Sequence, residues 1–140
     1  MAKPKVPIRK KRKMTITGKI VEGLGVGRDF TRIPWVRTEF VSKLSIDPYP
    51  GTLNLEIVDP RSLKTFEALK KTKGVEIPPQ NPSFCTGKCY PVLLNGRLKG
   101  AIVLPVVDDY PKNKLELITA ENAKEALSVE TGDLLEVEVT

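Results

Sequence analysis

The sequence predicts a mainly β protein, built as a small barrel of about six strands that is closed or nearly closed. Three observations lead to this fold class. The segments that alternate apolar and polar residues are short and numerous, and Asn95-Gly96 joins two of them with a strong hairpin signal. Long helical segments are absent, as is the strand–helix alternation of a doubly wound sheet. Short strands, hairpin turns and short helices together are typical of a small barrel.

Length and charge indicate one folded domain with a basic extension. A chain of 140 residues can bury a sizeable core as a single domain. Residues 1–13 hold seven of the 23 basic residues and no acidic one, which leaves 16 basic and 17 acidic residues over 14–140. We therefore expect a disordered basic tail over 1–13 and a single, nearly neutral domain over 14–140.

The basic tail and the lack of long apolar runs bear on where the protein is located and what it binds. It has neither the apolar stretch nor the cleavage site of a signal peptide, and no apolar run approaches the roughly 18 residues of a membrane span. We expect a monomeric, cytoplasmic protein that does not interact with membranes. A basic arm can hold nucleic acid by counterion release, or can simply solubilise the chain, so nucleic acid is at most a partner of the tail.

Cysteine and histidine usage restricts the possible chemistry. Cys85 and Cys89 are the only cysteines and histidine is absent, so four zinc ligands of the usual kind are not available within the chain. A disulfide between the two cysteines would close a very small loop, and we expect buried or half-buried free thiols. Any proton transfer must use a carboxylate, a lysine, a tyrosine or water.

The first half of the chain predicts two strands and two helices. A strand over 14–21, interrupted at Gly18, leads to a glycine-rich loop over 23–28. Apolar residues at helical spacing predict a short helix after Pro34, with an inner face of Val36, Phe40, Val41 and Leu44. The next strand covers 52–58 and is ended by Asp59-Pro60. Ser62 has the position of an N-cap for a helix with Leu63, Phe66 and Leu69 inside.

The second half predicts mainly strands. Residues 72–84 contain three prolines and little periodicity, which indicates an irregular excursion. Strands are expected over 88–94 and 98–104, joined by the Asn95-Gly96 turn, and over 114–118 after a polar loop at 108–113. Thr119 can cap a short helix over 120–127. The turn at 130–133 leads into a last strand over 134–139, where apolar and polar residues alternate clearly.

A glycine-rich segment, Gly23-Leu24-Gly25-Val26-Gly27-Arg28, suggests an anion site. A dinucleotide-binding turn would have to open a helix, and here Pro34 follows too soon. A Walker loop would end in Gly-Lys-Ser/Thr, which is missing. Three glycines still allow backbone N–H groups to approach an anion closely, and an arginine suits phosphate. A glycine-rich turn with a solvated arginine is an equally open interpretation.

A second motif, Pro48-Tyr49-Pro50-Gly51-Thr52-Leu53-Asn54-Leu55, runs from a tight turn into a strand. Side chains two apart share a face, so Thr52 and Asn54 point one way while Leu53 and Leu55 point into the core. Two neutral oxygen ligands suit a magnesium ion whose charge is balanced by phosphates. Taken alone, an edge strand with a polar outer face explains the pattern as well; the glycine loop upstream favours the metal.

The ordered set of motifs resembles the archaeal CTP-dependent riboflavin kinases. The glycine loop and the Pro48–Leu55 motif are followed downstream by Gly100-Ala101-Ile102-Val103-Leu104-Pro105 and Leu115-Glu116-Leu117-Ile118. The resemblance extends from about Thr15 to the last strand, with the Gly132-Asp133 turn included. Only the tail and the 72–84 excursion lie outside it.

The resemblance implies a cradle-loop β-barrel that transfers the γ-phosphoryl group of CTP to riboflavin and gives FMN and CDP. It implies that Thr52 and Asn54 bind Mg²⁺. Flavin contacts would come from Asp108 and Glu116, and Glu116 would orient or deprotonate the 5′-hydroxyl group. The nucleotide would be bound by residues of two segments, Gly23, Leu24, Gly25, Val26, Gly27, Arg28 and Asp29 in the loop and Glu121, Asn122, Ala123 and Lys124 further on.

Two departures from the family pattern affect the expected contacts. Where the family usually has a threonine followed by a histidine or an aromatic residue, this chain has Asp108-Asp109-Tyr110, which bears on the flavin contact. After Ile118 the family usually has Ala-Pro and a basic helix, whereas here Thr119-Ala120-Glu121-Asn122 follows, which bears on nucleotide choice.

The alternatives to a kinase are a non-catalytic flavin- or nucleotide-binding barrel and a nucleic-acid-binding barrel. Glu116 itself could be a solvent-facing residue of an alternating strand.

Overall fold

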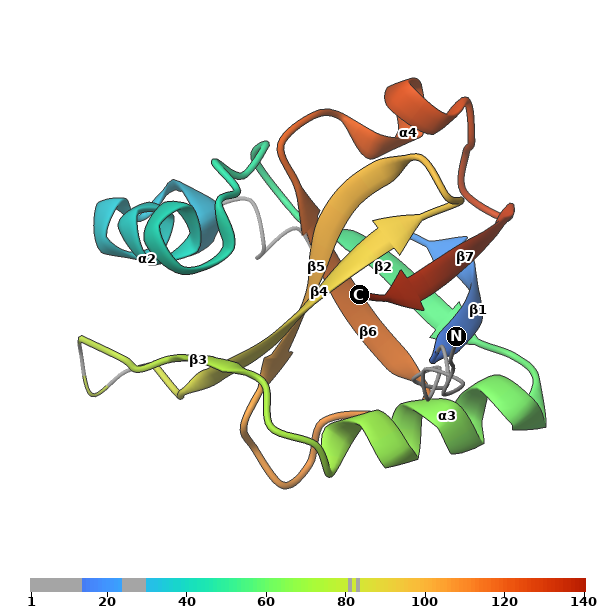
Figure 1. Ribbon diagram of the computed structural model, residues 1–140, viewed down its shortest axis with the longest axis horizontal. Helices are drawn as coiled ribbons and strands as arrows, with labels where there is room; N and C mark the ends of the chain where they lie inside the picture. The colour runs from blue at the N-terminus through green and yellow to red at the C-terminus, as the bar shows by residue number, and fades with distance from the viewer. Residues whose placement is uncertain (1–13, 24–29, 81, 83) are drawn as a thin grey trace, which may run out of the picture.

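The fold is a small antiparallel barrel with helices packed around it (Figure 1). The computed structural model describes residues 14–23, 30–80, 82 and 84–140. The strands are β1 (Thr15–Val21), β2 (Leu53–Ile57), β3 (Val75–Ile77), β4 (Gly87–Leu94), β5 (Leu98–Pro105), β6 (Lys114–Thr119) and β7 (Leu134–Val139). The helices are α2 (Pro34–Leu44), α3 (Pro60–Lys70) and α4 (Ala123–Leu127).

Six of the strands close into the barrel. They follow the order β4-β5-β6-β2-β1-β7, and the pairing of β4 with β7 joins the two ends. Strand β4 changes partner along its length: Cys89 lies opposite Val75 of β3, whereas Val92 lies opposite Val139 of β7. The predicted six-stranded barrel is therefore confirmed, and β3 is an additional strand that the sequence did not predict.

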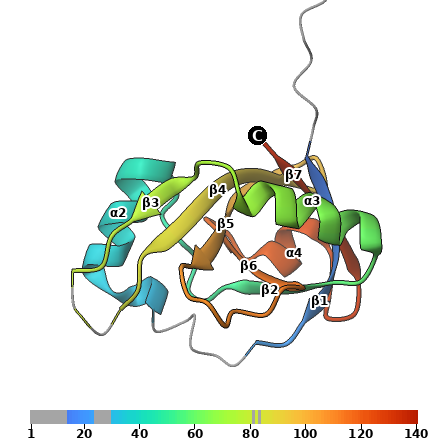
Figure 2. The same cartoon turned by 90° about the horizontal axis from the view of Figure 1, so that it is seen from below.

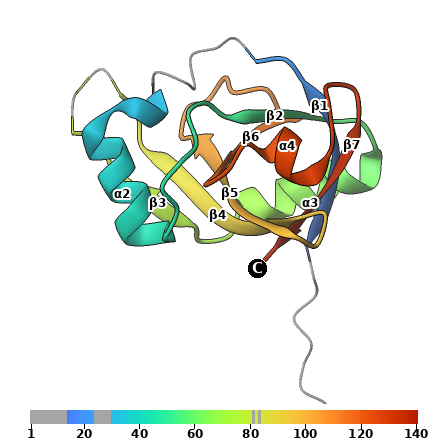
Figure 3. The same cartoon turned by 90° about the horizontal axis from the view of Figure 1, so that it is seen from above.

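The barrel interior is the main hydrophobic core. Alternate residues of each strand point inward, and Ile16, Leu55, Ile102, Leu115 and Leu135 are fully buried there. Helix α3 adds Phe66 and Leu69 to this core. In Figure 1 α3 and α4 lie at opposite ends of the barrel. The view from below (Figure 2) has α3 in front, and the view from above (Figure 3) has α4 in front.

A second core joins α2 to the outer part of the sheet. Val36, Phe40 and Leu44 pack with Ile77 and Cys89. Val41, predicted on the inner face, is 47% exposed, because the buried residues follow a single line of four-residue steps. Both cysteines are free thiols, as expected; Cys89 is buried, but the expectation of a buried or half-buried thiol is wrong for Cys85, which is exposed. Burial raises the pKa of the Cys89 thiol to about 12.

Three predictions, two for the first half and one for residues 72–84, need correction. Strand β1 is continuous through Gly18, which pairs with Ile57 on one side and Leu135 on the other. The predicted cap of the following helix was also wrong: α3 begins at Pro60, and Asp59 Oδ2 accepts a hydrogen bond from the Ser62 backbone N–H at 2.8 Å. The Ser62 hydroxyl oxygen instead accepts one from the Thr17 N–H at 2.9 Å. Residues 72–84 contain strand β3 in addition to irregular chain.

The second half follows the prediction more closely. The hairpin turn is confirmed, with positive φ at Asn95 (49°) and Gly96 (67°), and β7 has the predicted bounds. The last helix was placed too early: α4 begins at Ala123 and is capped by Asn122, because Thr119 belongs to β6 and its hydroxyl donates to the Glu121 carbonyl at 2.7 Å. In the described part of the chain, none of the helices has the length and apolar character needed to cross a membrane.

Candidate active site

The candidate site lies where β2 begins beside the middle of β6. Thr52 directly precedes β2, and Asn54, two residues on, lies opposite Glu116 of β6 in the strand register. The Thr52 hydroxyl donates a hydrogen bond to Glu116 Oε1 at 2.9 Å. The two residues predicted to bind metal and the residue predicted to act on the flavin are therefore neighbours, held by the pairing of two barrel strands.

Gly23 brings the start of the glycine loop onto the same residues. Val21, the last residue of β1, pairs with Asn54, so Gly23 passes over the Asn54 side chain. A Cβ atom at Gly23 would lie 2.8 Å from Asn54 Cγ, so a side chain there would require the Asn54 amide or the loop to shift. The Asn54 amide N–H donates to the Thr52 carbonyl at 3.4 Å, which leaves its Oδ1 oxygen for another partner.

Tyr110 completes the surroundings of Glu116. Its hydroxyl donates to Glu116 Oε2 at 3.2 Å, from the loop between β5 and β6. Burial raises the pKa of Tyr110, and the neighbouring Glu116 carboxylate raises it further, so the phenol stays neutral and remains a donor. Asp108, predicted to contact the flavin, is exposed in the same loop. The described residue of this loop that contacts Glu116 is therefore Tyr110. In the sequence, Tyr110 was noted only as part of a departure from the family pattern.

The predicted nucleotide-binding residues Glu121–Lys124 line a cavity of about 120 Å³ together with Thr52. Asn122 has two functions there: its Oδ1 accepts from the Glu125 N–H at 3.2 Å, and its amide N–H donates to the Tyr49 hydroxyl at 3.4 Å. The cavity therefore places the start of α4 next to the turn that precedes β2.

Lys124 links the same helix to the glycine loop. Its ammonium group lies 3.6 Å from Glu22 Oε2 and donates to the Thr131 hydroxyl at 3.0 Å. Glu22 is adjacent to Gly23, so the two predicted nucleotide-binding segments approach each other at this point. The rest of the first segment, Leu24, Gly25, Val26, Gly27, Arg28 and Asp29, lies outside the described residues.

Comparison with known proteins identifies the family. The family model for the CTP-dependent riboflavin kinase domain, described as "Domain of unknown function DUF120", matches residues 20–139. The chain belongs to the CTP-dependent riboflavin kinase family. Members of this family are phosphotransferases.

Proteins named riboflavin kinase align with most of the length of this chain. The protein of Sulfurisphaera tokodaii is 39% identical over 127 residues, which are 89% of this chain and 93% of the relative. The protein of Sulfolobus acidocaldarius is 35% identical over 133 residues, 93% of this chain and 84% of the relative. The protein of Methanocella arvoryzae is 39% identical over 125 residues, but this match covers only 55% of the longer relative.

The residues of this kinase-family chain fit a hard divalent cation. The Thr52 hydroxyl donates its proton to Glu116 and so keeps its lone pairs free, and Asn54 Oδ1 is a second neutral oxygen. Mg²⁺ prefers oxygen ligands and usually takes few from the protein when phosphates supply the rest. The described residues include no cluster of three or more His, Cys, Asp or Glu side chains, so phosphate oxygens would have to balance most of the cation's charge.

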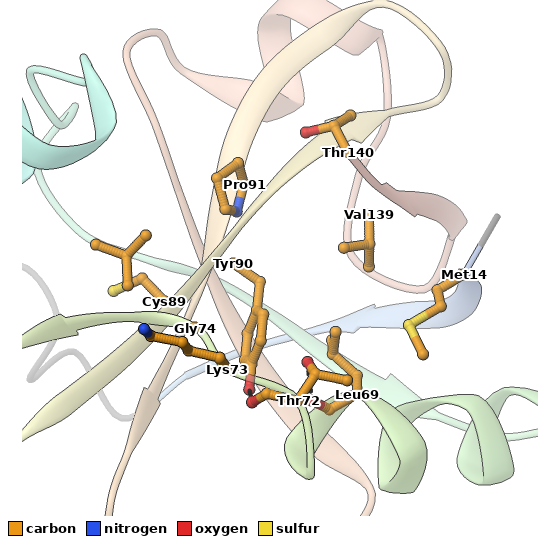
Figure 4. Close-up of a pocket in the computed structure, with 11 residues that line it drawn as sticks. Met14, Leu69, Thr72, Lys73, Gly74, Cys89, Tyr90, Pro91, Val139 and Thr140 are labelled. Atoms are coloured by element: carbon orange, nitrogen blue, oxygen red, sulfur yellow. Dashed lines mark hydrogen bonds between the residues drawn. The ribbon is translucent and has the colours of Figure 1, made fainter. Parts of the chain in front are cut away.

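A separate cavity of about 790 Å³ lies between the end of α3, β3, β4 and the end of β7 (Figure 4). Its described lining is largely apolar, and the Tyr90 hydroxyl donates to the Thr72 carbonyl at 3.0 Å on one side of it. Of the predicted site residues that the structure describes, none lines this cavity. It is therefore distinct from the candidate active site of this family member.

Proposed function

We propose that this chain transfers the γ-phosphoryl group of CTP to the 5′-hydroxyl group of riboflavin, giving FMN and CDP, with Mg²⁺ bound by Thr52 and Asn54. The proposal rests on family membership and on one observation: Thr52 Oγ1 lies 2.9 Å from Glu116 Oε1. A phosphate group held at Thr52 would be adjacent to a hydroxyl group held at Glu116. Phosphoryl transfer requires mainly this kind of positioning, together with charge neutralisation.

On the phosphate side, Thr52 and Asn54 would direct their oxygens at the cation while the strand register fixes their backbone. The bound cation would neutralise charge on the transferred phosphoryl group. Gly23 keeps the loop in contact with Asn54, and the amides of the glycine loop with Arg28 are proposed to hold the remaining anionic oxygens.

On the acceptor side, Glu116 has lone pairs available. A carboxylate offers about four acceptor positions, and Thr52 and Tyr110 use one on each oxygen. The free positions can accept the proton of the 5′-hydroxyl group, which orients that group for attack or removes its proton. Since the chain contains no histidine, a carboxylate is the natural choice for this role.

The nucleotide side is proposed to use Glu121, Asn122, Ala123 and Lys124, with the cavity beside Thr52 for the base and sugar. The neighbouring turn is fixed by hydrogen bonds from the Gly51 N–H to Thr31 Oγ1 at 2.9 Å and from the Tyr49 N–H to the Thr119 carbonyl at 2.7 Å. A flavin contact from Asp108, a monomeric state and a cytoplasmic location are further expectations from the sequence.

A nucleotide panel tests the proposal. The chain is incubated with riboflavin, Mg²⁺ and each of the four nucleoside triphosphates in turn, and FMN is separated by chromatography. We expect FMN with CTP at a rate well above the other three, and none when EDTA replaces Mg²⁺. Absence of FMN with all four nucleotides, from a protein shown to be folded by circular dichroism, would rule out the activity. An equal rate with ATP would rule out the preference for CTP.

A further inference from the structure

Tyr110 makes two different contacts, one through its ring and one through its hydroxyl group. Its ring packs against the barrel core as a half-buried side chain. Its hydroxyl leaves that core and donates to Glu116 Oε2 at 3.2 Å. The ring alone would satisfy the packing, so the hydroxyl group needs a separate explanation.

We infer that Tyr110 is a positioning residue of the phosphoryl transfer, which holds the Glu116 carboxylate in the orientation that receives the acceptor hydroxyl. This inference rests on the proposed function and assigns a further residue to the same site. Tyr110 acts through Glu116, and no contact with either substrate is required of it.

The positioning follows from the two donors on Glu116. One donor, Thr52 on Oε1, leaves the carboxylate free to rotate about its last bond, because a terminal torsion of this kind is broad. A second donor, Tyr110 on Oε2, fixes the plane of the group. The remaining lone pairs then point in defined directions, and a misplacement of reacting groups by about an ångström can cost on the order of a hundredfold in rate.

The two donors come from independent parts of the chain. Thr52 belongs to the turn before β2, whereas Tyr110 belongs to the loop before β6. The phenol is a suitable second donor because it carries no charge: a lysine at this position would neutralise the carboxylate, and a neutral hydroxyl orients the group without doing so.

Replacing Tyr110 by phenylalanine separates the two contacts, since the ring is kept and the hydroxyl is removed. We expect kcat to fall roughly ten- to hundredfold, the range typical of a lost hydrogen bond to a charged group, while KM for CTP changes less than twofold. Tyr90→Phe is the matched control, because Tyr90 is a buried tyrosine whose hydroxyl bonds to the Thr72 carbonyl away from the site. We expect its kcat to stay within twofold of the original chain.

A double-mutant cycle tests whether Tyr110 acts through Glu116. Tyr110→Phe is introduced into the Glu116→Ala chain, and single-turnover transfer from γ-³²P-labelled CTP measures rates far below the original. We expect less than a twofold further loss in that background. An effect of the same size in both backgrounds would overturn the inference, because loss of folding or of packing does not depend on Glu116. An unchanged kcat for Tyr110→Phe would overturn it as well, whereas absence of FMN from the original chain would instead remove the proposed function.

Discussion

Thr52 and Glu116 are joined by a hydrogen bond of 2.9 Å although 64 residues separate them in the sequence. The contact depends on the register between β2 and β6, in which Leu53 faces Leu117 and Asn54 faces Glu116. A shift of one residue would turn each side chain to the opposite face of the sheet. The barrel therefore does more than support the site, since its strand pairing determines which polar groups meet.

Removal of the two proposed Mg²⁺ ligands should abolish catalysis and leave the barrel intact. In the Thr52→Ala, Asn54→Ala double variant we expect FMN formation to fall at least a thousandfold, because the phosphates lose the cation that neutralises them. Both side chains are only partly buried, so the melting temperature should change little. Single-turnover assays and circular dichroism melts check the two expectations.

Thr38→Ala is the control for this pair. Thr38 is an exposed residue of α2, and its hydroxyl donates to the Pro34 carbonyl at 3.0 Å, so it offers the same group as Thr52 away from the site. We expect full activity from it. Undiminished FMN formation by the double variant would contradict the magnesium assignment.

A side chain at Gly23 is predicted to displace the Asn54 amide or the loop and so to disturb the proposed site. In Gly23→Ala the added methyl group would meet the Asn54 amide, so either the loop or the amide must move. We expect a large loss of kcat, about tenfold or more, with a raised requirement for Mg²⁺ in a metal titration. Gly87→Ala is the matched control, since a Cβ there would lie at an ordinary 3.7 Å from Ile77 Cβ. Equal activity of both variants would contradict the prediction.

Much of the fold could be predicted because many elements are determined locally. The Asn95-Gly96 hairpin needs only two residues that accept positive φ, and the alternation over Leu134–Val139 needs only one buried face. Strand β3 could not be predicted in this way. Its three residues form a strand because they pair with Gly87–Cys89. That partner lies ten or more residues away in the sequence, and local pattern does not reveal it.

The starts of two helices were misjudged for a common physical reason. Ser62 and Thr119 are both residue types that cap helices well. In the folded chain their hydroxyls are engaged elsewhere, by the Thr17 N–H and by the Glu121 carbonyl. Asp59 and Asn122 take the cap positions instead. Competition among several possible caps is decided by tertiary contacts, which a single sequence does not contain.

In the site, too, some features follow from local sequence and others depend on tertiary contacts. Thr52, Asn54 and Glu116 were selected from motifs, and the structure brings them together. The hydrogen bond from Tyr110 could not be predicted, because it depends on how the loop before β6 folds back over the barrel core. A tyrosine amid aspartates in a polar loop was the sole local signal, and it indicated a departure rather than a function.

Two adjacent residues of β7 should differ sharply in their effect on stability. Leu135 is 0% exposed in the barrel core, and Leu134 is 59% exposed on the other face. Leu135→Ala should lower the free energy of unfolding by about 2–5 kcal/mol, the usual cost of deleting a buried leucine side chain. Leu134→Ala should change it by about 0.5 kcal/mol or less. Urea denaturation measures both, and similar values for the two would contradict the strand's predicted orientation.

The cap of α3 should make part of the stability depend on pH. Hydrogen bonds from Ser62, first from its backbone N–H, hold the pKa of Asp59 below its ordinary value of 3.8. A carboxyl with a lowered folded-state pKa stabilises the fold above its unfolded pKa, and this contribution is lost as the pH falls through the folded-state pKa. Relative to Asp59→Ala, the original chain should therefore melt higher at pH 7, and the gap should close in the acid range below pH 3.8.

Asp59→Asn separates the cap from its charge. Asparagine caps helices about as well as aspartate and does not titrate in this range, so its advantage over Asp59→Ala should persist as the pH falls. The other carboxylates titrate in all three chains, and their effects cancel in the differences. Melting temperatures recorded from pH 7 down to pH 2 provide the comparison. A gap between the original chain and Asp59→Ala that stays constant over that range would show that the Asp59 carboxylate does not carry the cap.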